Sequence, residues 1–414
     1  MTWNPFRMFD KDSKSPIDAP KEAPALSAVA VPSVKSSLPN QEFAMSYVTR
    51  RSSFLYRTIA LTAALGFASI SVARADSEAD VRGAVYVLTN QPSGNSVMVF
   101  SRAGNGTLTY AASYSTGGKG AGTGADPLGS QGSLTLDSGF LLAVNAGSND
   151  VSLFAVDGDK LTLLDRAPSG GQMPVSVTMK GPIAYVVNAG GTPNISGYVV
   201  DALGKRLVAL PGSQRPLAGG ANAQPAQVKF APEGNELLVT EKGTQLIDTY
   251  AVGFTGYAST ATPHASNGVT PFGFSITARG YAVVSEAGSG AVSSYDVVDG
   301  KHLDSITASI HLGQSAPCWL VTTGDGRYAY TANAGSGTIS SLQIGADGTL
   351  SLLNPAAGTL SAPLDMALSS RSKFLYVREG NGAVSGFRVK PDGALEPIGS
   401  VTGVPPGAQG IAAR

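Results

Sequence analysis

Three glutamates in this sequence share a position that suits acid–base chemistry. Glu241, Glu286 and Glu379 each end a short run of β-branched, aliphatic and aromatic residues, and a turn-forming stretch follows each of them. A carboxylate at such a point can serve as a general acid or base when burial or a like charge raises its pKa. The alternative is that each carboxylate caps its own loop by accepting bonds from nearby backbone N–H groups.

Asparagines occupy the same position in further copies of the pattern. The runs 141–148, 184–191 and 328–336 all contain the sequence Asn-Ala-Gly directly after an apolar stretch. An amide at this point can bind a polar ligand, or it can cap its own turn like the glutamates. We call these repeated positions the anchor residues: Asn90, Asn145, Asn188, Glu241, Glu286, Asn333 and Glu379.

Each anchor residue belongs to a repeat with four strand-like runs and no helical period. The spacing between successive anchors is 43 to 55 residues, which is typical of propeller blades. In the unit around Asn333 the runs are 319–322, 328–332, 338–344 and 350–353, separated by Gly-rich turns. Seven copies predict an all-β fold, a seven-bladed β-propeller with four-stranded antiparallel blades.

The two ends of the repeat array predict how the ring closes. No innermost strand precedes the run that begins near Gly83, whereas residues 409–413 resemble the starts of other units, such as residues 225–230. We therefore expect the C-terminal strand to complete the first blade and remove the exposed sheet edges. The anchor residues would then lie on one face, around the mouth of the central channel.

Other candidate residues fall in the segments between the predicted blades. His264 and His311 are expected on the anchor face, where either could line a site. The Gly-rich stretch 117–124 lacks a phosphate-loop motif and predicts a flexible inter-blade loop, with Lys119 and Asp126 as its charges. The three histidines do not have the spacing of metal ligands, so no metal or cofactor is predicted.

The composition narrows the range of partners and compartments. Lys plus Arg and Asp plus Glu are equal at 29 each, so no strong positive field exists to attract nucleic acid. The partner is predicted to be a small molecule such as a lactone or sugar, or a protein, on the channel-mouth face. Cys318 is the single cysteine, which excludes an internal disulfide, and it is expected to be a small buried core residue.

The N-terminal region predicts export from the cytoplasm. Arg50, Arg51 and Arg57 precede an uncharged apolar stretch, residues 58–72, and a small-residue motif ends at Ala75. We predict a signal peptide over residues 45–75, cleaved after Ala75, a periplasmic or secreted protein and no membrane span after cleavage. The alternative is an uncleaved anchor. Residues 1–44 are predicted as a disordered leader or an artefact of the gene start, and residues 76–414 as the propeller.

The repeat units resemble those of a known family. The segment 316–333, the Tyr-Val-x-Asn runs and the loop 117–132 that leads into residues 142–150 are similar to the lactonase-type seven-bladed propellers. That family includes a 6-phosphogluconolactonase and enzymes of the 3-carboxymuconate cyclase type. The resemblance covers residues 83–414 and implies the same fold.

The resemblance also implies a location for lactone chemistry. Members of the family carry Pro-Arg-His at the start of an innermost strand and a Glu at the end of the next strand. Here the matching residues are Pro225, Ala226 and Gln227, followed by Glu241, so the expected Arg and His are replaced. The resemblance implies Glu241 as the base or water-orienting group. In a lactonase, Gln227, Glu286 and His264 would be accessory catalytic residues.

Two functional hypotheses follow from these residues. The first is an exported lactonase that acts on an unphosphorylated lactone or an ester. The second is a non-catalytic propeller that binds a small molecule, a glycan or a protein on the same face, which the missing Arg-His pair favours. The residues predicted to contact a ligand are Asn145, Asn188, Asn333, Glu379, His311 and Lys119.

Overall fold

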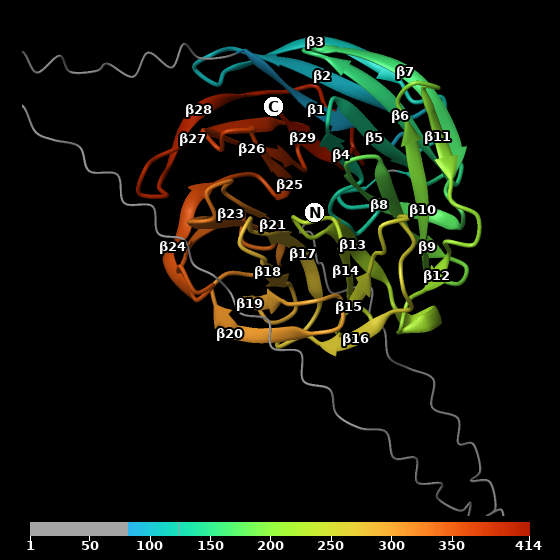
Figure 1. Cartoon of the computed structure of the whole chain (residues 1–414). Helices are drawn as coiled ribbons and strands as arrows, with labels where there is room; N and C mark the ends of the chain where they lie inside the picture. Colours follow the sequence, from blue (N-terminus) through green and yellow to red (C-terminus); the bar gives the residue numbers. More distant parts are fainter. Residues whose placement is uncertain (1–81, 123) are drawn as a thin grey trace, which may run out of the picture. The chain divides into compact units, whose positions relative to one another are not determined.

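A computed structural model describes residues 82–122 and 124–414, which form a closed ring of seven antiparallel sheets (Figure 1). The prediction of a seven-bladed propeller is confirmed. We number the blades 1 to 7 in chain order, and the predicted leader and signal peptide lie outside the described residues. No helix within the described part of the chain has the length and apolar character that a membrane span requires.

In blades 2 to 7 the strands run outward from the centre of the ring in sequence order, whereas the innermost strand of blade 1 comes from the C-terminus. From blade 1 to blade 7, the innermost strands are β29 (Ile411–Ala413), β4 (Leu134–Asp137), β8 (Gln172–Lys180), β13 (Pro225–Phe230), β17 (Pro271–Ile276), β21 (Pro317–Thr322) and β25 (Pro363–Leu368). The second strands are β1 (Gly83–Leu88), β5 (Phe140–Asn145), β9 (Ile183–Gly190), β14 (Glu236–Glu241), β18 (Tyr281–Glu286), β22 (Tyr328–Asn333) and β26 (Phe374–Glu379).

The outer half of each blade completes the sheet. The third strands are β2 (Ser96–Arg102), β6 (Asp150–Asp157), β10 (Asn194–Asp201), β15 (Leu246–Ala251), β19 (Ala291–Val297), β23 (Thr338–Ile344) and β27 (Val384–Val389). The outermost strands are β3 (Leu108–Ser115), β7 (Lys160–Pro168), β11 (Arg206–Ala209), β16 (Thr262–Ala265), β20 (Leu303–His311), β24 (Leu350–Thr359) and β28 (Leu395–Val401). Blade 3 also contains the short strand β12 (Arg215–Pro216), and the 3-10 helix η1 (Gly220–Asn222) precedes blade 4.

Burial explains the two sequence patterns seen along the blades. All six residues of β14, β22 and β26 are buried, because neighbouring blades pack on both faces of these second strands. Continuous apolar runs are the expected sequence for strands covered on both faces. The outermost strands β3 and β24 are mostly exposed. The core of the molecule therefore lies between the blades.

The C-terminal strand closes the ring, as the sequence predicts. β29 pairs with β1 in antiparallel register, with Val87 opposite Ile411 and Val85 opposite Ala413. The Leu88 N–H donates to Gly410 O at 3.0 Å, and the Gln409 N–H donates to Leu88 O at 2.9 Å. The first and last segments of the described chain thus share one sheet, and blade 1 gains its innermost strand.

A repeated tyrosine contact joins neighbouring blades. Tyr185 in blade 3 donates to Gly256 O in blade 4 at 2.7 Å, and Tyr376 in blade 7 donates to Gly106 O in blade 1 at 2.7 Å. Tyr86 and Tyr330 make the equivalent bonds to Gly158 and Gly393. Gly393 has φ 82°, and a Cβ there would lie 2.6 Å from the Tyr328 ring, so glycine is required at this turn.

Candidate functional site

The seven anchor residues lie next to the ends of the second strands, and we call that side of the ring the anchor face. All seven are 0–5 % exposed. The Glu241 carboxylate accepts from Gly219 N, at 3.1 Å for both oxygens, and from the Thr244 hydroxyl. Its own turn and the segment before blade 4 therefore hold this carboxylate. A group predicted to orient a water is instead fully buried and bonded to its own loop.

The other two anchor glutamates are held in the same way. Glu286 accepts from the hydroxyls of Ser293, at 2.5 Å, and Ser309, at 2.6 Å. Glu379 accepts from Ser361 N at 2.6 Å and from the Ser385 hydroxyl at 2.5 Å. Glu286 thus joins three strands of its own blade, and Glu379 joins β27 to the segment that precedes blade 7.

The predicted ligand-binding asparagines are also buried within their blades. Asn145 donates to Asp150 at 2.6 Å and to Ser152 at 2.8 Å, and Asn95 donates to its carbonyl at 2.9 Å. The Oδ1 atoms of Asn188 and Asn333 have no partner among the described residues. None of these three amides is exposed to a ligand in the closed ring.

The remaining predicted site residues do not converge on one point. Gln227 is 3 % exposed and accepts from Phe274 N at 2.7 Å, so it ties β13 to β17. His264 lies within the outermost strand β16 and contacts the Thr249 hydroxyl at 3.1 Å. The placement of His264 in an inter-blade segment is therefore corrected. His311 ends β20 and is exposed, and Lys119 is exposed on the anchor face.

The mouth of the central channel is occupied by the described part of the connection between blades 1 and 2, residues 116–122 and 124–133, which we call the mouth loop. Gln131 donates to Leu320 O at 2.7 Å and accepts from Leu320 N at 2.9 Å, and its own N–H donates to Ala226 O at 3.0 Å. Ser130 donates to Val175 O at 2.8 Å, and Trp319 donates to Ser130 O at 2.9 Å. The loop thus reaches the innermost strands of blades 3, 4 and 6 and lies across the centre of the ring.

Gln409, next to the closing strand, clamps the mouth loop from the other side. It accepts from Leu128 N at 3.0 Å and donates to Ser130 O at 2.8 Å and to the Asp126 carboxylate. Gly129 N also donates to Asp126 Oδ1, at 2.9 Å. Both bonds engage the same oxygen of Asp126, so its Oδ2 is left for a water or a ligand.

A lysine lies against this part of the loop. The Lys242 ammonium donates to Gly129 O and lies 5.0 Å from the centre of the Phe272 ring. Burial raises the pKa of the Asp126 carboxyl, an effect that the Lys242 charge opposes. Burial likewise lowers the pKa of Lys242, and the charge of Asp126 opposes that shift. Both residues are partly exposed as a whole, but burial is the dominant influence on the pKa of each ionisable group.

A second pair of ionisable groups interacts electrostatically with Asp126 and is sealed from solvent. Asp365 and Arg378 are 2 % and 1 % exposed. Arg378 donates to Ala125 O at 3.1 Å, but its Nε and Nη2 have no partner among the described residues, and neither has Asp365 Oδ2. Burial raises the pKa of Asp365 to about 8 and lowers the pKa of Arg378 to about 10. Asp365 is therefore protonated at neutral pH, and Arg378 carries a buried charge.

These two pairs form the candidate site, because they are the shifted titratable groups that gather at the mouth of the channel. Lys242 and Arg378 both interact electrostatically with Asp126, and a cation at such a point can stabilise a developing oxyanion. Cys318 lies close enough to interact with Asp126 and Lys242, but burial raises the pKa of its thiol, so it is not an activated nucleophile. Among the described residues no group of three or more His, Cys, Asp or Glu side chains could hold a metal ion.

Sequence reasoning located the neighbourhood of this site but not its members. Lys242 directly follows Glu241, and Arg378 directly precedes Glu379. Asp126 was recognised only as a charge of the loop. A charged residue next to an anchor residue in the sequence could have revealed Lys242 and Arg378, because neighbouring residues at the end of a second strand lie at the same mouth of the channel.

Arg378 provides a test of the sealed pair. We expect Arg378→Met to keep or raise the free energy of unfolding by about 1–3 kcal/mol, because a buried charge with unpaired donors costs more than an apolar side chain of similar volume. Arg102→Met is the control: Arg102 donates to Arg414 O at 3.0 Å, so its loss should destabilise the protein. Urea unfolding measures both, and a large loss of stability in Arg378→Met would contradict the expectation.

Asp365 predicts a pH dependence of stability. The folded state keeps this proton up to about pH 8, whereas an unfolded chain releases it near the ordinary value of about 3.9. The unfolded state therefore binds fewer protons between these values, and the free energy of unfolding falls as pH rises through that window. Asp365→Asn should reduce the fall between pH 5 and pH 8 by roughly 2–4 kcal/mol. An equal fall in both proteins by urea unfolding would refute this assignment.

Part of the chain matches a known protein family. Residues 277–359, which begin just before β18 and end with β24, match the family model described as Lactonase, 7-bladed beta-propeller. The chain is similar to the lactonase family of seven-bladed β-propellers. No curated protein matches the sequence.

Solved structures share the fold of this lactonase-like propeller. A candidate 6-phosphogluconolactonase from Bacteroides fragilis superimposes with a TM-score of 0.61 at 19 % identity, covering 82 % of this chain and 99 % of that one. The periplasmic gluconolactonase PpgL of Pseudomonas aeruginosa gives a TM-score of 0.61 at 16 % identity, covering 80 % and 99 %. A protein from Lactobacillus plantarum gives 0.62 at 17 % identity, covering 81 % and 100 %. At such identities these likenesses define the fold alone.

Proposed function

We propose that this lactonase-like propeller hydrolyses a lactone or a carboxylic ester at the mouth of its channel, with Asp126 as the general base. The observation that carries the proposal is the half-buried pair of Asp126 and Lys242, whose pKa values burial shifts in opposite directions. A base is most effective when its pKa lies near the working pH, and burial moves Asp126 that way.

The reaction can be written with the groups present at the mouth. Asp126 Oδ2 removes a proton from water as the water oxygen bonds to the carbonyl carbon. The carbonyl oxygen becomes an oxyanion, which the Lys242 ammonium stabilises. The ring C–O bond then breaks, and the leaving oxygen takes the proton back from Asp126. Lactone plus water gives the hydroxy acid, and Asp126 returns to its carboxylate form. The Arg378 charge favours that ionised form.

Export completes the proposal. We propose that the protein acts outside the cytoplasm, on an unphosphorylated substrate. Its support is the sequence alone: the arginines near residue 50, the apolar stretch over residues 58–72 and the small-residue motif that ends at Ala75. The balanced charge of the chain is consistent with a small-molecule partner and gives no reason to expect nucleic acid.

A panel of γ- and δ-lactones, sugar lactones and simple esters tests the activity. The purified full-length protein should hydrolyse at least one of them, and Lys242→Met should lower kcat by roughly 100-fold, the effect of losing one oxyanion donor. Lys119→Met is the matched control, since Lys119 is an exposed lysine of the mouth loop on the same face. Equal loss in both variants, or none in either, would remove Lys242 from the chemistry.

A non-catalytic binding propeller is the second candidate. The specific observation in its favour is that Ala226 and Gln227 replace the Arg and His implied by the family resemblance. Both are buried, and Ala226 O and the Gln227 amide are bonded to neighbouring segments of the ring. The absence of turnover on every lactone and ester, with a ligand nevertheless bound at the mouth, would favour this candidate.

A further inference from the structure

Arg378 leaves one edge of its guanidinium group without a hydrogen-bond partner in the interior of the ring. The residue is 1 % exposed, and its Nη1 donates to Ala125 O at 3.1 Å. Its Nε and Nη2 have no partner among the described residues. These two nitrogens form the side-on edge of the guanidinium, where two parallel N–H groups suit a single anion. We call this unpaired edge the Arg378 fork.

Asp365 lies next to the Arg378 fork in the sheet of blade 7. β25 carries a β-bulge opposite Arg378, and the two bulged residues are Leu364 and Asp365. Asp365 Oδ1 accepts from Met366 N at 2.9 Å, whereas Oδ2 is buried without a partner in the described part of the chain. Burial raises the pKa of Asp365 to about 8, so the neutral carboxyl carries its proton on the unbonded Oδ2. This O–H is a further donor beside the fork.

The carboxyl groups near the fork do not pair with it. Asp126 and Asp365 both act electrostatically on Arg378, yet over residues 82–122 and 124–414 neither bonds to Nε or Nη2. Asp126 is instead held by Gly129 N and by Gln409. A water molecule can accept from the fork, but it leaves the buried guanidinium charge uncompensated, which is costly. A cationic fork beside a carboxyl O–H therefore favours an anion over a cation or a neutral ligand.

The fork lies where blade 7 meets blade 1, and its burial limits the kind of anion. Figure 1 shows β25 and β26 beside β29, and the Ile411 N–H of β29 acts on the Asp365 carboxyl. Arg378 and Asp365 are almost completely shielded from solvent. An anion here must be small and must lose its hydration shell, a cost that rises steeply with charge. These conditions suit a monovalent halide.

We propose that Arg378 and Asp365 bind a small monovalent anion, such as chloride, at the seam between blades 7 and 1. The anion accepts from Nε and Nη2 of Arg378 and from the Asp365 hydroxyl. It compensates the buried guanidinium charge and thereby stabilises the folded ring. The site adjoins Asp126, but the proposal does not depend on the proposed hydrolase activity.

Thermal unfolding of the full-length protein tests this site with chloride as the probe. Raising sodium chloride from about 1 mM to about 300 mM should raise the melting temperature of the wild type by at least about 2 °C more than that of Arg378→Met. General effects of salt act on both proteins and cancel in this comparison. The low-chloride buffer is also the condition in which Arg378→Met should match or exceed the wild type in stability. Equal shifts in the two proteins would overturn the proposal.

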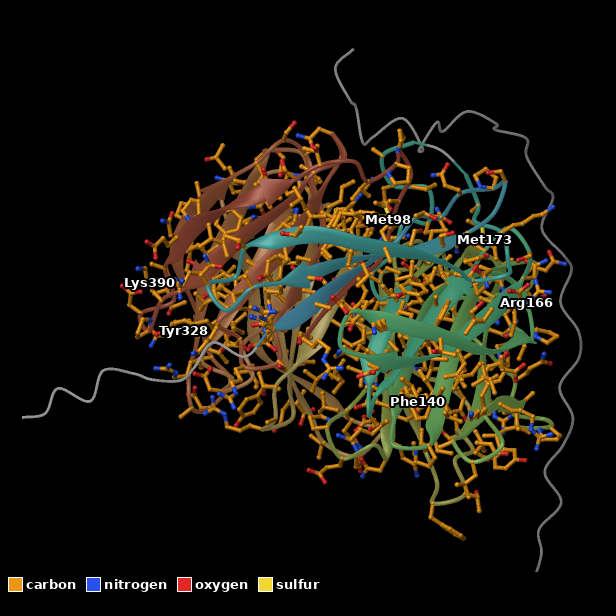
Figure 2. The ribbon with its side chains drawn as sticks, turned by 90° about the horizontal axis from the view of Figure 1, so that it is seen from above. Met98, Phe140, Arg166, Met173, Tyr328 and Lys390 are labelled. Carbon is orange, nitrogen blue, oxygen red and sulfur yellow. The ribbon has the colours of Figure 1, made fainter. Side chains whose placement is uncertain are left out.

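Arg166→Met is the matched control. The Arg166 side chain is 46 % exposed at the periphery of the molecule, where it pairs with Asp150 at 3.2 Å (Figure 2). Its substitution should leave the chloride shift of the wild type intact. A shift lost equally in Arg166→Met and Arg378→Met would indicate screening of surface charge and would contradict a bound anion.

Arg378→Lys separates the fork from the charge, and it provides the comparison if Arg378→Met does not fold. Lysine keeps a cation but has no side-on edge, so the chloride shift should fall to at most about half of the wild-type value. An undiminished shift would show that the fork does not bind the anion.

Anomalous diffraction from crystals grown in sodium bromide locates the site directly. We expect a bromide peak in contact with Nε and Nη2 of Arg378. Bromide found at surface residues alone would be an adventitious ion only and would overturn the assignment.

Discussion

Asp126→Asn should lower kcat/KM for the hydrolysed lactone by about 100- to 10,000-fold, the usual contribution of a general base. Asparagine keeps the size of the side chain, and its carbonyl can still accept from Gly129 N. The same carbonyl can also accept from the Gln409 amide. What is lost is the ability of Oδ2 to remove a proton from water. Initial rates of hydrolysis over a range of pH measure the effect.

Glu241→Gln separates this prediction from the one that the sequence made. Glu241 is buried and bonded to Gly219 and Thr244, so its substitution should reduce stability more than it reduces the rate per folded molecule. The melting temperature measures the loss of stability, and the concentration of active sites converts the observed rate into a rate per folded molecule. Full activity in Asp126→Asn, together with lost activity in folded Glu241→Gln, would return the catalytic role to Glu241.

Removal of residues 409–414 should lower the free energy of unfolding by at least about 5 kcal/mol and abolish hydrolysis. The truncation deletes β29, which pairs with β1 through Val85, Tyr86 and Val87, and it leaves blade 1 with an open inner edge. It also removes Gln409, which holds Asp126 and the mouth loop. Urea unfolding and the lactone assay measure the two losses.

Gln409→Leu separates ring closure from the clamp on the loop. This variant keeps β29 and should lose only about 1–3 kcal/mol of stability, since the polar groups that Gln409 satisfies become unpaired. Its hydrolysis should still fall, because Asp126 loses a fixed orientation. A truncated protein that unfolds cooperatively at the wild-type urea concentration would show that β29 is not needed for closure.

The sequence alone determined the architecture, because a propeller repeats its local physics seven times. Buried runs such as 328–333, each ended by an anchor and a turn, recur at a spacing that one four-stranded blade requires. The C-terminal closure followed from the same repeat, since residues 409–413 have the pattern of an innermost strand with no blade of its own. These signals are local, because the periodicity of the sequence reports strand pairing and burial within each blade.

The candidate site could be decided only by the tertiary structure. Glu241, Glu286 and Glu379 are predicted because their position repeats, and in the structure each carboxylate bonds to its own blade or to the connection before it. The residues of the candidate site do not repeat from blade to blade, and they lie far apart in the chain: Asp126, Lys242, Asp365 and Arg378. Their pKa shifts arise from burial at the centre of the ring, where the mouth loop covers them. No spacing in the sequence encodes that convergence, because it results from the closure of the ring.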